Sequence, residues 1–370
     1  MPIVLDGTQG ISTPMYAGSI SSNPVTPVIG MKNKIINGAC VIDQRNAGAS
    51  VTPTASTYTL DRWQFQCTQA SKVRLQQESS ASTGPVGFQN YIGMTSLSAY
   101  SVLTSDFFAL RQGIEGFNTA DLQWGTANAK TVTLSFWVNC TLTGTFGGSI
   151  VNNANNRSYP FTYTINSANA WEQKTITIAG DTTGTWVGAT NGIGLNLYLG
   201  LGVGATYRGT AGAWSAGNYV SATGATSLVG TNGAVLYLTG VQLEVGSTAT
   251  SFDYRPYGTE LALCQRYYYL HVSGATSLAI CNGFYANASN AQGLLTFPVT
   301  MRATPTTAIV SGTSFYATGT SNNLNSFSLA NGTPQTVTIF NNTQASGTSG
   351  VATSLLTNNA SAFVAFTAEL

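Results

Sequence analysis

A single histidine limits the catalytic chemistry open to this chain. Nucleophilic arrangements of the Ser-His-Asp or Cys-His kind need an imidazole base, and His271 is the only histidine in 370 residues. It follows Tyr267–Leu270 in an apparent strand, so we expect a packed or surface strand histidine. A zinc site needs clustered histidines and cysteines, and five scattered cysteines without a CxxC pair do not supply one. We expect these cysteines to be buried, reduced thiols.

The number of acidic residues alone does not exclude hydrolysis. Glycoside hydrolysis needs only two carboxyl groups, and the chain has thirteen acidic residues. No internal repeat of the kind that stacks short strands into a long solenoid is present. We therefore predict no catalytic residue and no enzymatic activity. We predict no cofactor either, with a structural calcium ion as the open alternative. Four acids have the oxygen atoms that calcium prefers, although they equally suit loops and strand ends: Asp43, Asp61, Asp121 and Glu244.

Aromatic side chains are the better candidates for binding. Sugars present apolar C–H faces that stack on Trp or Tyr, while polar side chains hydrogen-bond the hydroxyls. The interval 198–219 offers such residues among glycine, alanine and serine. We predict a glycan-binding site of five residues: Tyr198, Tyr207, Arg208, Trp214 and Tyr219. The alternative is that Trp214 and Tyr219 pack against the rest of the protein or a neighbouring chain.

Period-two alternation predicts that β-strands position these residues. In 131–139 the apolar residues Val132, Leu134, Phe136 and Val138 alternate with a face that includes Trp137. Similar alternation over 194–201, 234–244 and the last forty residues favours antiparallel sheets, each with one covered face. We expect an all-β fold. The tryptophans within strands are expected mostly in the core: Trp63, Trp137 and Trp171.

Two short helices are also expected. Thr104 or Ser105 could cap a helix over 106–112, and Thr259 could cap one over 260–266. In the second, Glu260 suits the positive N-terminal end of the helix dipole and Arg266 the C-terminal end. This second helix lies where the content of charged residues drops, so it predicts a domain junction.

Charge is unusually scarce. Only 7% of residues are charged, against roughly 25% in a typical soluble domain. From residue 267 onward the only charged residues are Arg302 and Glu369. A surface without charge favours burial in an oligomer, with an uncharged monomer as the alternative. No basic cluster favours nucleic acid, and no apolar run is long enough to span a membrane. The first thirty residues carry four prolines and no core pattern, so they are either disordered or ordered by partner chains.

Two groups of short sequence motifs resemble the first and last strands of a β-sandwich module found in bacteriophage tail fibers and receptor-binding proteins. The motifs of the first group are Asn37-Gly38, Asp43-Gln44-Arg45 and Asp61-Arg62-Trp63. The motifs of the last group are 240–246 with Phe252 and Arg255-Pro256. Residues 260–268 and then 297–306 resemble the passage into a C-terminal domain of such proteins. The resemblance rests on the order and spacing of these motifs, and it covers residues 34 to about 268 and continues beyond them.

The resemblance implies a fold and a role. The fold is a carbohydrate-binding-module-like jelly-roll β-sandwich followed by a smaller β-sandwich, with a short extended N-terminal segment. We expect a segment at 1–30 for attachment or trimerisation, a jelly roll at 31–257, a helical linker at 258–265 and a C-terminal β-sandwich at 266–370. The expected protein is a homotrimeric virion tail fiber, made in the bacterial cytoplasm, that binds a host surface glycan and other tail or virion proteins. The alternative is a structural virion component, such as a capsid decoration or head-fiber protein, without a ligand.

Overall fold

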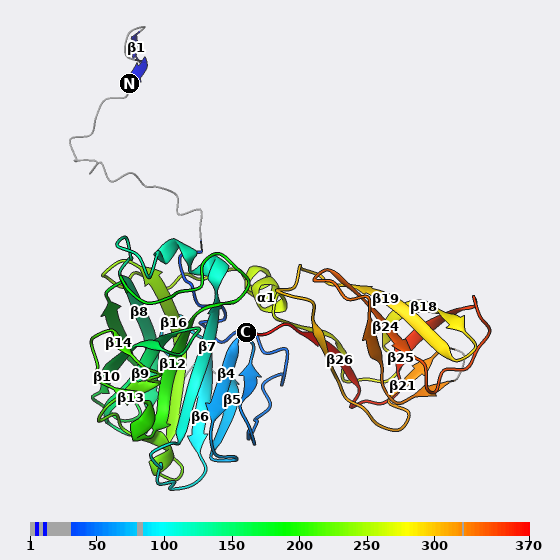
Figure 1. Ribbon diagram of the computed structural model, residues 1–370, viewed down its shortest axis with the longest axis horizontal. Helices are drawn as coiled ribbons and strands as arrows, with labels where there is room; N and C mark the ends of the chain where they lie inside the picture. The colour runs from blue at the N-terminus through cyan, green and yellow to red at the C-terminus, as the bar shows by residue number, and fades with distance from the viewer. Residues whose placement is uncertain (1–3, 7–9, 13–30, 80–83, 320–321) are drawn as a thin grey trace. The chain divides into compact units, whose positions relative to one another are not determined.

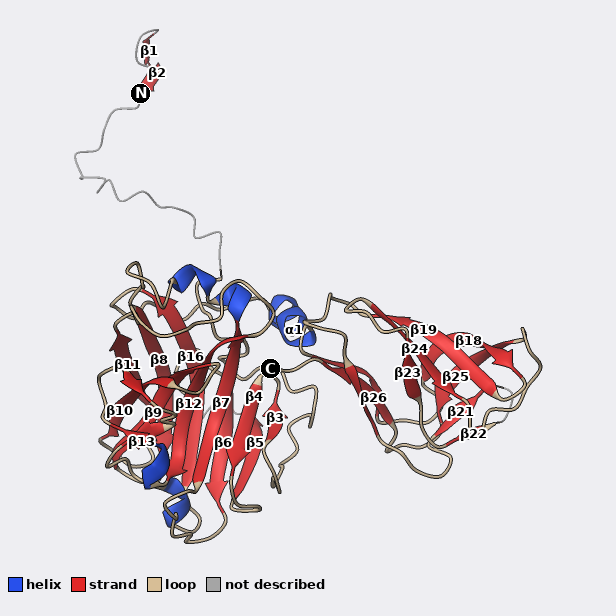
Figure 2. Ribbon diagram, viewed as in Figure 1, coloured by secondary structure: helices blue, strands red, loops and turns tan. Residues whose placement is uncertain are grey.

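The computed structural model describes residues 4–6, 10–12, 31–79, 84–319 and 322–370. These residues fall into two compact units, 1–31 and 32–370. In the first unit, β1 (Val4–Asp6) pairs antiparallel with β2 (Gly10–Ser12). The rest of the N-terminal segment expected at 1–30 lies outside the described residues. The regular elements of the second unit are almost all strands (Figures 1 and 2), as the alternation predicted.

A sandwich of two antiparallel sheets occupies the first part of the second unit, and we call it the first sandwich (Figure 2). Its seven-stranded sheet runs in the order β14 (Ser215–Ala216), β10 (Arg157–Ile165), β9 (Gly144–Asn152), β12 (Ile193–Val203), β7 (Phe107–Glu115), β4 (Trp63–Cys67) and β3 (Thr57–Leu60). Its five-stranded sheet runs in the order β11 (Glu172–Ile178), β8 (Val132–Cys140), β16 (Val235–Val245), β6 (Asn90–Ser96) and β5 (Val73–Ser79). Alternate residues of both sheets meet in one apolar core.

Short elements join these strands. A two-stranded parallel ladder is formed by β13 (Arg208–Gly209) and β15 (Ser221–Ala222). The single-turn 3-10 helices are η1 (Gly116–Asn118), η2 (Ala120–Leu122), η3 (Ala205–Tyr207) and η4 (Leu228–Gly230). The only α-helix of the described residues, α1 (Tyr257–Gln265), follows the first sandwich. It begins two residues before the expected cap Thr259, and no side chain caps it.

The helix expected over 106–112 is wrong. Residues 107–112 belong to β7, which pairs with β12 on one side and β4 on the other. Phe108, Leu110 and Ile114 point into the core, a period of two that local caps do not override. The side chain of Asp106, expected as the first helical residue, accepts hydrogen bonds from Tyr100 and Thr68.

Strands after α1 form a second, smaller sandwich with its own apolar core. Its three-stranded sheet runs in the order β17 (Tyr268–Ser273), β26 (Phe363–Thr367) and β20 (Thr306–Ile309). Its other sheet, which we call the C-terminal seven-stranded sheet, runs in the order β22 (Asn323–Leu324), β21 (Tyr316–Thr318), β25 (Ala352–Thr357), β18 (Ala279–Asn287), β19 (Asn290–Thr296), β24 (Thr336–Asn341) and β23 (Ser328–Ala330). In the described residues no strand of the first sandwich pairs with one of the second.

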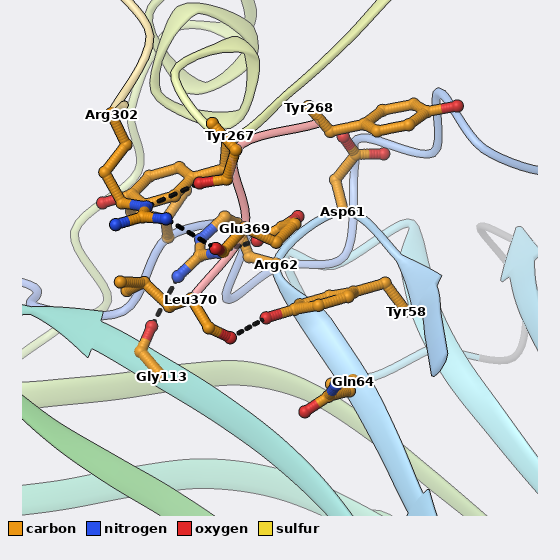
Figure 3. A network of polar contacts seen from close by, with 12 residues as sticks. Tyr58, Asp61, Arg62, Gln64, Gly113, Tyr267, Tyr268, Arg302, Glu369 and Leu370 are labelled. Atoms are coloured by element: carbon orange, nitrogen blue, oxygen red, sulfur yellow. Dashed lines mark hydrogen bonds and ion pairs between the residues drawn. The ribbon is translucent and has the colours of Figure 1, made fainter. Parts of the chain in front are cut away.

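Ion pairs join the two sandwiches. Glu369, just after β26, pairs with Arg62 and with Arg45, the latter at 2.7 Å. Arg62 is fully buried, and its guanidinium carbon lies 3.6 Å from the ring centre of Tyr267. Figure 3 shows Arg62 and Glu369 side by side, with Leu370 reaching Tyr58. We call this group of contacts the junction.

A second pair of contacts completes the junction. Glu115, at the end of β7, accepts hydrogen bonds from Arg266 at 2.5 and 2.9 Å and from the Tyr267 hydroxyl at 2.6 Å. Burial raises the pKa of Glu115, but these hydrogen bonds outweigh it and hold the net pKa below its usual value. Arg302 donates to the backbone oxygens of Ala368 and Asn191. Both charged residues beyond 267 are therefore engaged at the junction.

Candidate functional site

A pocket of about 210 Å³ opens on the first sandwich where three separate segments meet. One segment is the opening stretch 33–41, the second is 87–90 before β6, and the third is 252–255 after β16. The aromatic side chains in its wall are Phe88, Phe252 and Tyr254. We call it the Phe88 pocket.

The three rings pack on one another at the pocket wall. Phe88 and Phe252 meet edge to face with ring centres 5.1 Å apart, and Phe252 meets Tyr254 in the same way at 4.8 Å. Phe88 is buried, Phe252 is half-buried, and Tyr254 is 56% exposed. The Tyr254 hydroxyl donates to the backbone oxygen of Gly87 at 2.9 Å, which fixes the ring at the rim. An apolar ring surface is thus held open to solvent.

Backbone geometry at Gly240 makes room for Phe88. The pairing of β16 with β8 shifts register between Thr239 and Gln242, and Gly240 there has a φ of +61°. A Cβ at Gly240 would lie 2.7 Å from the Phe88 ring and 3.1 Å from Trp137. Only glycine combines this φ with such close ring contact. The bulge in β16 therefore decides where Phe88 sits.

Polar groups line the pocket beside the rings. Asp253 is half-buried, and its Oδ2 accepts a hydrogen bond from the Asn33 backbone at 3.3 Å. The Oδ1 of Asp253 and the side chains of Gln89 and Asn90 have no hydrogen-bond partner in the described part of the chain. These groups are available to a ligand.

One charged pair at the pocket is committed to the fold. Arg255 hydrogen-bonds the carboxylate of Glu260 at 3.2 Å and also donates to the backbone oxygens of Asn33 and Ile35. Glu260 in turn accepts from the Asn37 backbone. This pair fastens the opening segment to α1 and lines the pocket. Asp253, whose Oδ2 lies 3.8 Å from Arg255, is the more exposed of the two acids in the lining.

None of the five residues expected to bind glycan lines the Phe88 pocket. Tyr198 is buried in a small apolar cluster with Ala109, Val151 and Val220, so its ring does not face solvent. Tyr207 is half-buried, and its ring centre lies 5.1 Å from that of Phe107. Two of the five residues are therefore occupied by packing.

The remaining three are also partly packed. Trp214 meets the rings of Trp124, Trp186 and Tyr159 edge to face with centres 5.2–5.4 Å apart. Its indole N–H donates to the Ala179 oxygen at 2.8 Å. Tyr219 is half-buried against Gly209 and Gly217, and a Cβ on either glycine would lie within 3 Å of its ring. Arg208 is half-buried, and its buried Nε has no hydrogen-bond partner among the residues that the structure describes. The structure does not gather these five side chains around one open pocket.

Among the strand tryptophans expected in the core, only Trp63 lies fully there. Trp137 is half-buried on the outer face of the five-stranded sheet, on the strand face that alternation assigned to it. On the same outer face Tyr237 and Tyr91 meet edge to face at 5.3 Å, and Trp171 lies 6.3 Å from Tyr237. Aromatic side chains thus extend along this sheet from the Phe88 pocket.

The described ranges contain neither a group of side chains that could hold a metal ion nor a serine, cysteine or acid hydrogen-bonded to the histidine. His271 lies in β17 and hydrogen-bonds the Tyr269 hydroxyl and the Ile280 oxygen. No group of three or more acidic, histidine or cysteine side chains that could hold a metal ion occurs among those residues. All four calcium candidates have protein partners: Asp61 accepts from Gln44, Asp121 from Lys34 and Glu244 from Thr250. Asp43 likewise accepts from the backbone of Asn46 and Gly48.

Sequence reasoning missed the Phe88 pocket because its wall comes from segments more than 160 residues apart. One local signal was present. Phe252 and Tyr254 alternate directly after the closing strand, in a stretch without core periodicity, and Phe88 stands alone between turn residues. An aromatic residue outside a strand pattern has no sheet face to bury it, which makes it a candidate for a surface site.

No protein-family model matches the chain, and no curated protein matches it. Among solved structures, the chain is similar to the enzymatically active domain of bacteriophage CBA120 tailspike protein 4, with 11% identity and a TM-score of 0.32. That match covers 58% of this chain but only 22% of the tailspike chain. A putative sugar binding protein from Bacteroides thetaiotaomicron has 12% identity and a TM-score of 0.31, covering 58% of this chain and 100% of that one.

A family 11 carbohydrate-binding module from Clostridium thermocellum, solved with a mixed-linked tetrasaccharide, is also similar. It has 10% identity and a TM-score of 0.28, and the match covers 51% of this chain and 91% of the module. Because these TM-scores are low, the fold is described by its own strand order and sheet pairing. The question of function rests on the geometry of the pocket.

Proposed function

We propose that this chain binds a neutral glycan without cleaving it, and that the Phe88 pocket holds one sugar unit of that glycan. The observation that carries the proposal is the exposed Tyr254 ring beside hydrogen-bonding groups that the fold leaves unused. Tyr254 and Phe252 would stack on the apolar face of a sugar. Asp253, Gln89 and Asn90 would hydrogen-bond its hydroxyls.

The size of the pocket argues for a single unit. Its volume of about 210 Å³ is below the range of roughly 300–1,000 Å³ for drug-sized ligands. A terminal or branching sugar therefore suits it better than the middle of a straight polysaccharide. With one accessible carboxylate, the contact needs no cationic partner, so added salt should change the affinity little.

We further propose that the glycan is on a host cell and that the chain acts as a virion tail fiber. The support for this part is the ordered series of sequence motifs from Asn37-Gly38 to Arg255-Pro256. The first motif and the last both contribute a residue to the lining of the Phe88 pocket, Gly38 and Arg255. One small pocket binds weakly, and several copies on one particle would raise the effective affinity through avidity.

Binding of the full chain to an array of host surface glycans, followed by titration of the best ligand, tests the proposal. Tyr254→Ala should weaken binding by on the order of 1 kcal/mol, since it removes one stacking surface. Tyr257→Ala is the matched control, because Tyr257 is 64% exposed, three residues away and outside the pocket lining. Equal affinities of the two variants would reject the pocket as the binding site.

Two further outcomes separate the alternatives. If Trp214→Ala weakens binding in a correctly folded protein while Tyr254→Ala does not, the site lies in the interval 198–219. If the full chain binds none of the host glycans, the structural virion role without a ligand is favoured. Release of new reducing ends from the bound polysaccharide would show hydrolysis and contradict the non-enzymatic role.

A further inference from the structure

The outer face of the C-terminal seven-stranded sheet departs from the usual pattern of an antiparallel sheet. Such sheets normally turn one apolar face to the core and one polar face to water. Here Tyr285, Leu295, Val337 and Ile339 fill the core side. On the opposite side, however, Leu294 is 62% exposed and Phe284 is 44% exposed. Large apolar side chains therefore stand on both faces.

Strand register places these side chains together. One cross-strand row runs through Ala352, Phe284, Gln292, Phe340 and Ser328, on five adjacent strands. Leu294 follows Gln292 by two residues on the same strand, so it stands on the same face, and it pairs with Thr338, which pairs with Ala330. Residues opposite or diagonal in such rows are close enough for their side chains to touch. Phe284, Leu294 and Phe340 therefore surround Gln292 as one apolar patch.

Charge is absent from this face. The only charged residues beyond 267 are Arg302 and Glu369, and both are engaged at the junction with the first sandwich. A partner that relies on charge, such as an acidic protein or an anionic membrane surface, would find no counter-charge here. A second copy of the same face brings no charge either, so two copies do not repel each other.

Shape also favours a second copy. A shallow hollow of about 330 Å³ lies beside Phe284, between Asn282, Gly319 and Ser354. A protruding ring and an adjacent hollow on the same face are what a self-complementary contact needs. Exposed apolar patches on soluble proteins commonly mark such contacts.

We propose that the outer face of the C-terminal seven-stranded sheet packs against the same face of other copies of this chain around a common rotation axis. The contact is independent of the Phe88 pocket, which lies on the first sandwich. It assigns a use to the uncharged surface of the second sandwich and provides a way of gathering several pockets on one assembly.

Thiol labelling tests this directly on the full chain. Leu294→Cys places a thiol on the face, and Leu103→Cys is the matched control, since Leu103 is 60% exposed on the first sandwich. In the assembled protein, a maleimide should label Leu294→Cys at least about tenfold more slowly than the control, because interface cores exclude water as interiors do. Diluting the protein to monomers should remove the difference. Peptide mass spectrometry separates these sites from the native cysteines.

Charge insertion provides the second measurement. Phe284→Lys combined with Leu294→Lys should move the dissociation midpoint, followed by light scattering, to at least about tenfold higher concentration. Phe117→Lys with Leu103→Lys adds the same charge at exposed apolar sites on the first sandwich and should leave the midpoint unchanged. Circular dichroism checks folding, and Phe284→Ser with Leu294→Thr replaces the lysine pair if that pair does not fold. Equal labelling of the two cysteines in the assembly, an unchanged midpoint, or a monomer at every concentration would overturn the proposal.

Discussion

Glu369 links the two sandwiches through ion pairs with two arginines. Its carboxylate pairs with Arg62, a cation that is fully buried. We predict that Glu369→Gln lowers the free energy of unfolding by about 3–5 kcal/mol, because it leaves a buried cation without its partner. Lys32→Gln removes a more exposed pair with Glu244, at 3.9 Å, and should cost at most about 1 kcal/mol. Urea unfolding of both variants gives the comparison, and similar losses would show that the buried pair has no special weight.

Asp61 should make stability depend on pH. Burial raises the pKa of Asp61 to about 7, and neither nearby Arg45 nor two hydrogen bonds from Gln44 offset it. A carboxyl whose pKa is higher in the folded state stabilises the fold fully below its unfolded pKa of about 3.9. That contribution is lost as pH rises to about 7.

Unfolding of the wild type and of Asp61→Asn at several pH values checks this prediction. The stability of the wild type relative to Asp61→Asn should fall steadily between about pH 4 and pH 7. Other carboxyls, such as Glu115, contribute equally to both proteins and cancel in the difference. A difference that stays constant over this range would show that Asp61 ionises normally in the fold.

At the scale of elements, the bulge in β16 positions the pocket. We predict that Gly240→Ala destabilises the fold by more than the roughly 1–2 kcal/mol that a left-handed backbone costs an alanine, since its Cβ also meets Phe88. The matched control is Gly233→Ala, which has a φ of +74° but open space around a Cβ. Thermal unfolding should separate the two, and only Gly240→Ala should also weaken glycan binding. Equal losses would mean that Phe88 moves aside without cost.

Strand content could be read from the sequence because alternation is a local signal. The faces of β8 were assigned correctly, including the side on which Trp137 stands. The strand β7 was mistaken for a helix because Thr104 and Ser105 before it resemble helix caps, and only pairing with β4 and β12 decides its form. The partial exposure of Trp137 could not be predicted from the sequence, because it depends on which face of the sheet remains uncovered in the fold. The pocket needs contacts between distant segments, which no local pattern specifies.

At the scale of the whole molecule, two separate cores are joined mainly by charged and aromatic side chains. We predict that residues 32–370 unfold in a single calorimetric transition, because unfolding of either sandwich alone would break the ion pairs of Arg62 with Glu369 and of Arg266 with Glu115. Glu115→Gln together with Glu369→Gln should split this into two transitions, one for each sandwich. Two transitions already present in the wild type would show that the second sandwich, expected at 266–370, folds independently of the junction.

The cluster of Trp124, Trp186 and Trp214 has an optical consequence. Its three indole centres lie 4.8–5.4 Å apart, near enough for their excited states to couple. All six tryptophans of the chain precede residue 215. Intrinsic indole fluorescence, and any exciton band in the far-ultraviolet dichroism, would therefore report on the first sandwich alone. The melting of the first sandwich can therefore be followed without adding a label, and any unfolding step that leaves this signal unchanged belongs to the tryptophan-free second sandwich.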